Sequence, residues 1–166
     1  MNLRPVFTLV RDRVSAIVNG ITTVPLADTA LFNSSFQNYD SLLILINKTA
    51  GGTASGTVNI YIEDSWDGGV TWDDLVSSVQ IALGAAAATQ RFWVQGRIAP
   101  AVHTAGASTL STQGSAAAAE TLAAGSARQG PFGDRLRVRE VVAGVSGSPV
   151  GCTYTITIIP CRSEDQ

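Results

Sequence analysis

The chain has 166 residues, a formal net charge of −2, 45% hydrophobic residues and only 14% charged residues. Typical domains carry roughly 25% charged residues, so this composition favours a surface that is buried in an assembly. The near-neutral charge argues against a nucleic-acid binder. No apolar run reaches the ~18 residues that span a bilayer, and the N-terminus lacks the pattern of a signal peptide. We therefore expect one domain with neither a nucleic-acid nor a membrane partner.

The sequence offers no metal or cofactor site. Its two cysteines, Cys152 and Cys161, would lie about 30 Å apart on one strand at ~3.3 Å per residue, so we expect free thiols rather than a disulfide. One histidine and two scattered cysteines do not form a zinc site. We therefore expect no metal and no cofactor.

Residues 1–13 are predicted to form an extended N-terminal arm, although the spacing of the apolar residues also allows a short helix. Strands are predicted at 14–18 and 21–26, joined at Asn19-Gly20, a strong two-residue hairpin signal. Three arginines make the arm basic, and they either contact a partner or are solvated charges on a frayed end: Arg4, Arg11 and Arg13.

The middle of the chain is rich in strand patterns. Residues 42–47 are apolar on both faces, which indicates a central strand covered on both sides, or covered on one side by another subunit. Residues 58–64 alternate between apolar and polar, and a further strand is predicted at 74–81. Between these two runs lies Ser65-Trp66-Asp67-Gly68-Gly69-Val70-Thr71-Trp72, in which Asp-Gly-Gly is typical of a turn.

This hairpin resembles an Asp-box, a motif that is repeated in sialidases and occurs singly in unrelated β proteins. The residues that carry the resemblance are Ser65, Asp67, Gly69, Thr71 and Trp72. The resemblance implies that they hold the turn together and take no part in catalysis. Trp66, near the tip of the turn, is the better candidate for contact with a partner protein or a sugar.

A long insertion rich in Ala, Gly, Ser and Thr is predicted at 95–130, after a short strand at 90–94. Propensity allows a helix at 115–124, but only Leu122 would anchor it. Loops of this length are usually functional or linkers. We expect the insertion to order against a neighbouring subunit, with a disordered surface loop as the alternative.

Two strands are predicted in the last part of the chain. The first, Arg135 to Val142, places three arginines on one face, where they either grip carboxylates or phosphates or form salt bridges with acids of the chain: Arg135, Arg137 and Arg139. Its alternation slips after Glu140, which suggests a bulge or the strand end. The second strand, 152–158, alternates regularly, and Pro160 is expected to stop it.

These patterns predict an all-β protein with about eight strands, a jelly-roll-like antiparallel β-sandwich. The expected organisation is an extended arm at 1–13, one β-sandwich domain at 14–160 that contains the 95–130 insertion, and a C-terminal tail at 161–166.

The order of these elements resembles small β-sandwich virion proteins of tailed bacteriophages, head decoration (cement) proteins among them. The resemblance covers Ser41 to Pro160 apart from the insertion, and rests on the Thr49–Thr53 turn, the Asp-box hairpin, the Arg-Leu-Arg-Val strand, the Gly144–Pro149 turn and the final Thr-rich strand. It implies a structural protein, trimeric if it is a cement protein, that is made in the host cytoplasm and sits on the outer surface of the capsid against the major capsid protein.

Other functions fit less well. A tail or neck component is the first alternative, because such modules are similar, and a carbohydrate-binding module is the second, because Trp66 could stack on a sugar ring. Catalysis is not expected: the chain has one Asp-box and is too short for a sialidase propeller, and the hairpin acids cannot face one another across a groove. Their spacing does not match a calcium-binding EF-hand loop either.

Overall fold

The structure is a computed structural model that describes residues 7–12, 20–25, 39–49, 55–84, 87–96, 122–131, 133, 135–145 and 153–161. Within these ranges the protein is all-β, as predicted, and has no helix that could cross a membrane. The strands are β1 Phe7–Asp12, β2 Gly20–Pro25, β3 Ser41–Lys48, β4 Thr57–Ser65, β5 Asp73–Ser77, β6 Ile81–Ala82, β7 Ala88–Gln95, β8 Ser126–Ala127, β9 Arg135–Ala143 and β10 Thr153–Cys161.

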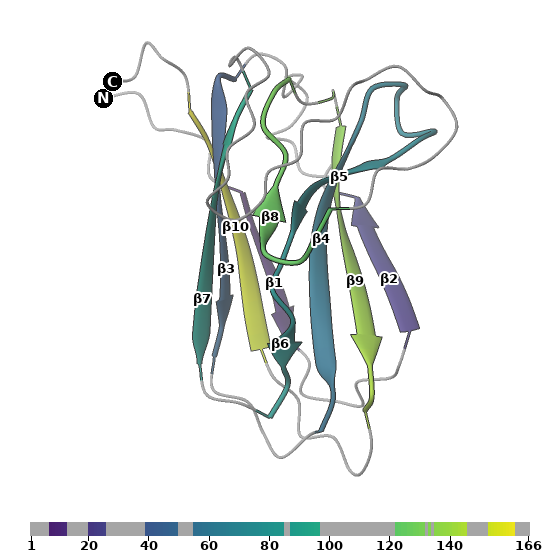
Figure 1. Ribbon diagram of the computed structural model, residues 1–166, viewed down its shortest axis with the longest axis vertical. Coiled ribbons are helices and arrows are strands. Elements are labelled where there is room, and N and C mark those ends of the chain that lie inside the picture. The colour runs from purple at the N-terminus through teal and green to yellow at the C-terminus, as the bar shows by residue number, and fades with distance from the viewer. Residues whose placement is uncertain are drawn as a thin grey trace.

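The strands form two antiparallel sheets that lie side by side in Figure 1. The four-stranded sheet has the order β1-β10-β3-β7. The six-stranded sheet has the order β2-β9-β4-β5-β8, with the short β6 paired to β4. Long strands that are neighbours in the chain therefore often lie in different sheets, and most contacts join residues far apart in sequence.

The core lies between the two sheets and is built from the inward rows of their strands. Alternation along each strand turns every second side chain inward. The four-stranded sheet contributes residues such as Ile44 and Ile156, and the six-stranded sheet contributes residues such as Ile60 and Val138, all fully buried. The alternation expected for the last strand is present, with Tyr154, Ile156 and Ile158 buried and the intervening threonines half-buried.

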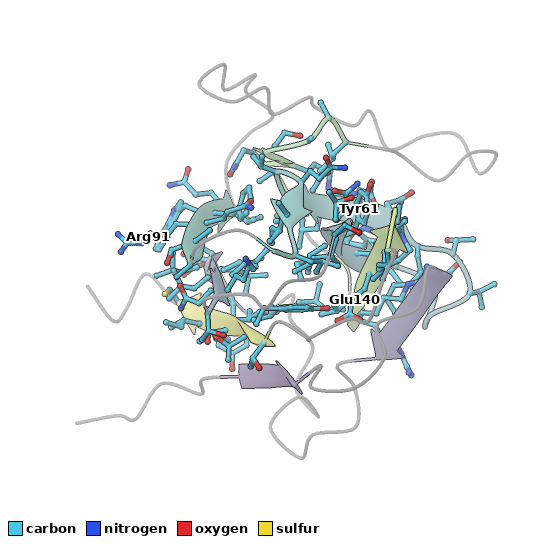
Figure 2. The ribbon with its side chains drawn as sticks, turned by 90° about the horizontal axis from the view of Figure 1, so that it is seen from below. Tyr61, Arg91 and Glu140 are labelled. Atoms are coloured by element: carbon cyan, nitrogen blue, oxygen red, sulfur yellow. The ribbon has the colours of Figure 1, made fainter. Side chains whose placement is uncertain are left out.

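Strand β9 is regular throughout, so the prediction of a bulge or a strand end after Glu140 is wrong. Its register against β4 runs without a shift from Ser65↔Arg135 to Thr57↔Ala143. The alternation of apolar and polar residues is broken in the sequence because Glu140, a charged residue, occupies a position in the inward row and is fully buried. In Figure 2, which looks along the strands, Glu140 lies on the side of β9 that faces the other sheet.

At the N-terminus, residues 7–12 of the expected arm form β1, an edge strand paired with β10 from Phe7↔Ile158 to Asp12↔Thr153. The strand expected at 21–26 corresponds to β2, which pairs with β9. The strand expected at 14–18 lies outside the described residues, as do Arg4 and Arg13.

The strand expected at 74–81 is two strands, β5 and β6, because a side chain interrupts the ladder. Ser78 donates its N–H to the carbonyl of Ile60 (2.9 Å), but its hydroxyl, not its carbonyl, accepts the N–H of Ile60 (2.8 Å). The next residue, Val79, is instead held by the Gln90 side chain of β7, which accepts its N–H (2.8 Å) and donates to its carbonyl (2.9 Å). This pair of bonds ties the two sheets together.

The proline expected to stop the last strand lies inside it, because β10 continues to Cys161 with Pro160 opposite Leu42 of β3. Within the described residues β1 reaches only as far as Ile158, so Pro160 lies where β10 has β3 as its only described neighbour. A proline is tolerated at such an edge-like position. The end of the expected insertion is also more ordered than predicted, because Ser126–Ala127 form β8 on β5 and Leu122–Ala124 are not helical.

Candidate interaction site at the Asp-box hairpin

Hairpin 65–72, called the Asp-box hairpin below, is organised by the carboxylate of Asp67. Oδ1 accepts hydrogen bonds from the Ser65 hydroxyl (2.8 Å) and from the N–H groups of Val70 (2.9 Å) and Thr71 (2.8 Å). Oδ2 accepts the Thr71 hydroxyl (2.7 Å) and its N–H (3.0 Å). The Ser65 hydroxyl also accepts the N–H of Gly69 (2.8 Å). The backbone N–H groups of Gly69, Val70 and Thr71 are thus held by two side chains.

Glycine and tryptophan complete the turn. Gly68 and Gly69 have φ of 75° and 99°, which side-chain-bearing residues rarely adopt. The indole N–H of Trp72 donates to the Gly69 carbonyl (2.9 Å), and a Cβ on Gly69 would lie 3.3 Å from the Trp72 ring. The structure therefore brings together all five residues that carry the Asp-box resemblance.

The hydrogen bonds on Asp67 favour its charged form. They lower the pKa of its carboxyl well below the ordinary value, first through the Thr71 hydroxyl, then through the Thr71 N–H and the Ser65 hydroxyl. The carboxylate is therefore ionised at neutral pH and has its acceptor positions occupied by the turn. It is not a free group for acid–base chemistry.

Two large apolar side chains project from this fixed turn. Trp66 is 39% exposed and Val70 is 81% exposed. Neither side chain is needed for the hydrogen bonds of the turn, which come from its other residues and from backbone groups. A rigid tip that carries an aromatic and an aliphatic side chain is suited to contact with another surface, because little conformational entropy is lost when it binds.

Beside the hairpin, two arginines of β9 stack on aromatic rings. The guanidinium of Arg137 lies 4.3 Å from the centre of the Trp72 ring, and that of Arg139 lies 3.9 Å from the Tyr61 ring. The almost fully buried carboxylate of Glu63 accepts a hydrogen bond from each arginine. We call Glu63, Arg137, Arg139, Trp72 and Tyr61 the arginine ladder.

Glu63 reaches both arginines because the regular register between β4 and β9 places it opposite Arg137, with Arg139 two positions further along the same face of β9. The register between β4 and β5 shifts between Ile62 and Glu63. Arg139 also donates to Asp74 of β5 (3.0 Å). Burial alone would lower the pKa of Arg139, but the hydrogen bond and charge of Glu63, with those of Asp74, outweigh it and raise the pKa.

A second, fully buried ion pair holds the end of the expected insertion. Asp64 accepts hydrogen bonds from Arg128 and from the N–H of Gly133 (2.8 Å), and Asp74 accepts the N–H of Leu122 (3.1 Å). Burial raises the pKa of Asp64, with Arg128 and Gly133 as partial offsets, and burial also raises that of Asp74. Leu122, Arg128 and Gly133 are therefore bonded to β4 and β5, the strands on either side of the Asp-box hairpin.

The predicted partner contacts divide into three groups. Trp66 and Arg135 are exposed, as a contact residue must be. Arg137 and Arg139 are held by acids of the chain itself, which is the salt-bridge alternative considered for these residues. Arg11 lies in β1 opposite Tyr154, and only its backbone is described.

Sequence reasoning missed Glu63 and Arg128 as the centres of the two ionic clusters. The sequence signal for Glu63 is its outward position in the alternation of β4, on the face that meets the arginine row of β9. For Arg128 there is no local signal, because its partner Asp64 is far away in sequence.

Five acids lie in or next to the hairpin, but among the described residues no group of three His, Cys, Asp or Glu side chains is placed to hold a metal ion. The chain matches no protein family model, no curated protein and no solved structure. The arrangement of the hairpin itself is therefore the basis for the functional proposal.

Proposed function

We propose that this protein is a structural component of a tailed-bacteriophage virion, a capsid decoration protein that contacts the major capsid protein and copies of itself on the outer surface of the shell. The observation that carries the proposal is the Asp-box hairpin, whose fixed backbone presents Trp66 and Val70 to solvent. Aromatic side chains at such positions are frequent anchors of protein interfaces.

The pairing of charges supports a binding role over catalysis. Glu63, Asp64 and Asp74 each accept hydrogen bonds from an arginine or from backbone N–H groups, and Asp67 is occupied by the turn. Catalytic acids and bases need a proton that can be exchanged with a substrate. In the described part of the chain the carboxylates around the hairpin serve the fold instead.

The strand pairing supports the jelly-roll part of the proposal. If the short β6 and β8 are set aside, eight long strands remain. The first pairs with the last, the second with the seventh, the third with the sixth and the fourth with the fifth: β1 with β10, β2 with β9, β3 with β7, and β4 with β5. A long hairpin rolled into two sheets gives this pairing, and jelly rolls are frequent in virion proteins.

The physical effect of such a protein is linkage. A protein that binds the mature lattice and not the disassembled subunits stabilises the lattice by RT ln(1 + [L]/Kd), about 2.7 kcal/mol per site at 100 times Kd. Many sites on one shell multiply this effect. The trimer that the phage resemblance implies would add avidity, because three tips would bind together.

Co-sedimentation with capsids tests the proposal. Purified protein is mixed with heads of the encoding phage that lack it, and bound protein and the temperature of head disruption are measured. We expect saturable binding and a higher disruption temperature. Binding should be lost in the double variant Trp66→Ala, Val70→Ser. The matched control is Val79→Ser, because Val79 is also an exposed apolar residue (53%) and lies away from the tip.

Two results would count against this function. If the protein binds purified tails or necks and not heads, it is a component of those parts instead. If the tip variant and the Val79 variant bind heads equally well, the Asp-box hairpin is not the contact. Unchanged far-UV circular dichroism and melting of each variant ensure that the comparison concerns binding and not folding.

A carbohydrate-binding module is the second candidate, because the exposed indole of Trp66 on a rigid turn is also suited to stacking on a sugar ring. A glycan array distinguishes the two functions. Binding to a defined polysaccharide that is lost with Trp66→Ala, together with no binding to capsids, would favour the module over the virion role.

A further inference from the structure

The outer face of the four-stranded sheet carries apolar side chains that the fold itself does not require. Its outward rows align across three strands: Trp93, Leu43 and Ile159 form one row, and Arg91, Leu45 and Thr157 form the next. Leu43, Leu45 and Ile159 are only half-buried, and Trp93 is 41% exposed. We call these six residues the sheet patch.

The apolar character of β3 is the first reason to assign the patch a partner. The inward residues of β3, such as Leu42 and Ile44, account for its place in the core. The outward leucines do not, because a strand with one solvated face normally alternates with polar residues. Two leucines at neighbouring outward positions of the same strand indicate that this face is covered in the functional protein.

The charge on the patch is the second reason. Among the described outward residues of β3, β7 and β10, Arg91 is the one charged side chain, and it projects from the edge strand β7 (Figure 2). The leucines lie on the inner strand β3. This distribution, with an apolar centre and a polar rim, is that of an interface. The outer face of the other sheet instead carries the charged arginine ladder.

The size and flat shape of the outer face of the four-stranded sheet indicate which kind of partner would fit it. Four strands at ~4.8 Å spacing, about eight residues long at ~3.3 Å per residue, give a flat footprint of about 500 Å². This footprint is of the same order as the ~800 Å² of accessible surface that each partner contributes to a standard interface. A flat pleated face packs well on another pleated face at ~10 Å separation.

We infer that the sheet patch binds the same patch of a second copy of this chain. The same face of a second copy has the required flatness and size. When two copies pack through this face, Arg91 stays at the rim in water, while Leu43, Leu45 and Ile159 meet in the centre. Each contact joins two copies, so a trimer uses another surface. The inference deepens the self-association in the proposed function, but its test needs no capsid, so the two can fail separately.

Light scattering on a sizing column, with sedimentation velocity over a range of concentrations, tests the inference. We expect the full chain to form a dimer, or a larger assembly with an even number of copies. Leu45→Glu and Trp93→Ser should each weaken association by about tenfold or more. The control is Val141→Glu, which places the same charge at a half-buried outward position of β9 in the other sheet and should leave the mass unchanged.

Each outcome decides the question. Weaker two-fold association of both patch variants with native circular dichroism, together with an unchanged control, would support the inference. If Leu45→Glu does not fold, Trp93→Ser decides, because Trp93 is on an edge strand and largely exposed. A wild-type monomer at all concentrations, or an oligomer that neither variant weakens, would overturn it. In that case capsid binding through the Asp-box hairpin could still be found.

Discussion

Glu63 is expected to be the most sensitive single position of the arginine ladder. In Glu63→Gln the side chain keeps its shape but loses its charge, so Arg137 and Arg139 no longer share a carboxylate. Arg139 keeps Asp74 as an acceptor at 3.0 Å. Arg137 keeps the Trp72 ring and can share only the neutral amide oxygen of the new side chain. The substitution therefore leaves one guanidinium without an anionic partner in a partly buried position.

The magnitude follows from the burial of the groups. Breaking a buried ion pair by removing one partner costs about 3–5 kcal/mol. The arginine side chains keep 24% and 21% of their surface exposed, so water screens part of the loss. We expect Glu63→Gln to lower the free energy of unfolding by about 2–3 kcal/mol, which corresponds to a decrease in Tm of about 4–12 °C for a domain of this size.

Urea unfolding followed by tryptophan fluorescence measures this change. The matched control is Arg135→Gln, which removes one charge from the same row of β9 at an exposed position and should stay within about 0.5 kcal/mol of wild type. If the two variants are equally stable, Glu63 is not the centre of a stabilising network and the reasoning from burial is wrong.

Three further outcomes are expected. The pKa of Asp67 is lowered in the folded state, so the contribution of its carboxylate to stability is present above the ordinary value of 3.8 and is lost as the pH falls below it. The difference in unfolding free energy between wild type and Asp67→Asn should therefore shrink from pH 6 to pH 2.5. A difference that stays constant over this range would contradict the argument. Gly133→Ala should lower the free energy of unfolding by about 3 kcal/mol or more, because the added Cβ would lie 1.9 Å from the Ser65 carbonyl oxygen. Gly68→Ala places its Cβ in open space and should lower the free energy of unfolding by about 1–2 kcal/mol, because of the positive φ at this position. Equal melting temperatures of the two variants would refute the steric argument. Arg128→Met should lower the unfolding free energy by about 3–5 kcal/mol by leaving the carboxylate of Asp64 buried and unpaired, and a double variant with Asp64→Leu should recover most of that loss in the same urea assay.

Local alternation was sufficient to predict most of the long strands. The observed β4, β7, β9 and β10 each include the predicted residues or differ from them by one at an end, since each buries every second side chain in a single core. The Asp-box hairpin was predictable for a different reason. All its hydrogen bonds join residues within four positions of one another, so the motif is complete in the local sequence.

The errors arose where a distant residue decides the local structure. The ladder breaks after Ser77 because the Ser78 hydroxyl replaces a backbone acceptor and Gln90 of the other sheet holds Val79. Pro160 is accepted inside β10 because the described residues of β1 do not reach that end of the strand. Glu140 looked like a strand end because no local pattern predicts a carboxylate in an inward row. Each of these needs the tertiary arrangement.

The same long-range contacts determine how stiff the Asp-box hairpin is. Its strand ends are held by the Trp72–Arg137–Glu63 stack on one side and by Gly133, whose N–H bonds to Asp64 next to Ser65, on the other. Glu63→Gln should therefore weaken capsid binding in the co-sedimentation assay although Glu63 does not touch the tip. The weakening should appear as faster dissociation, because a less rigid tip loses more entropy when bound. If Glu63→Gln lowers stability but leaves binding unchanged, the hydrogen bonds of Asp67 alone hold the tip, and the ladder belongs to the fold and not to the interface.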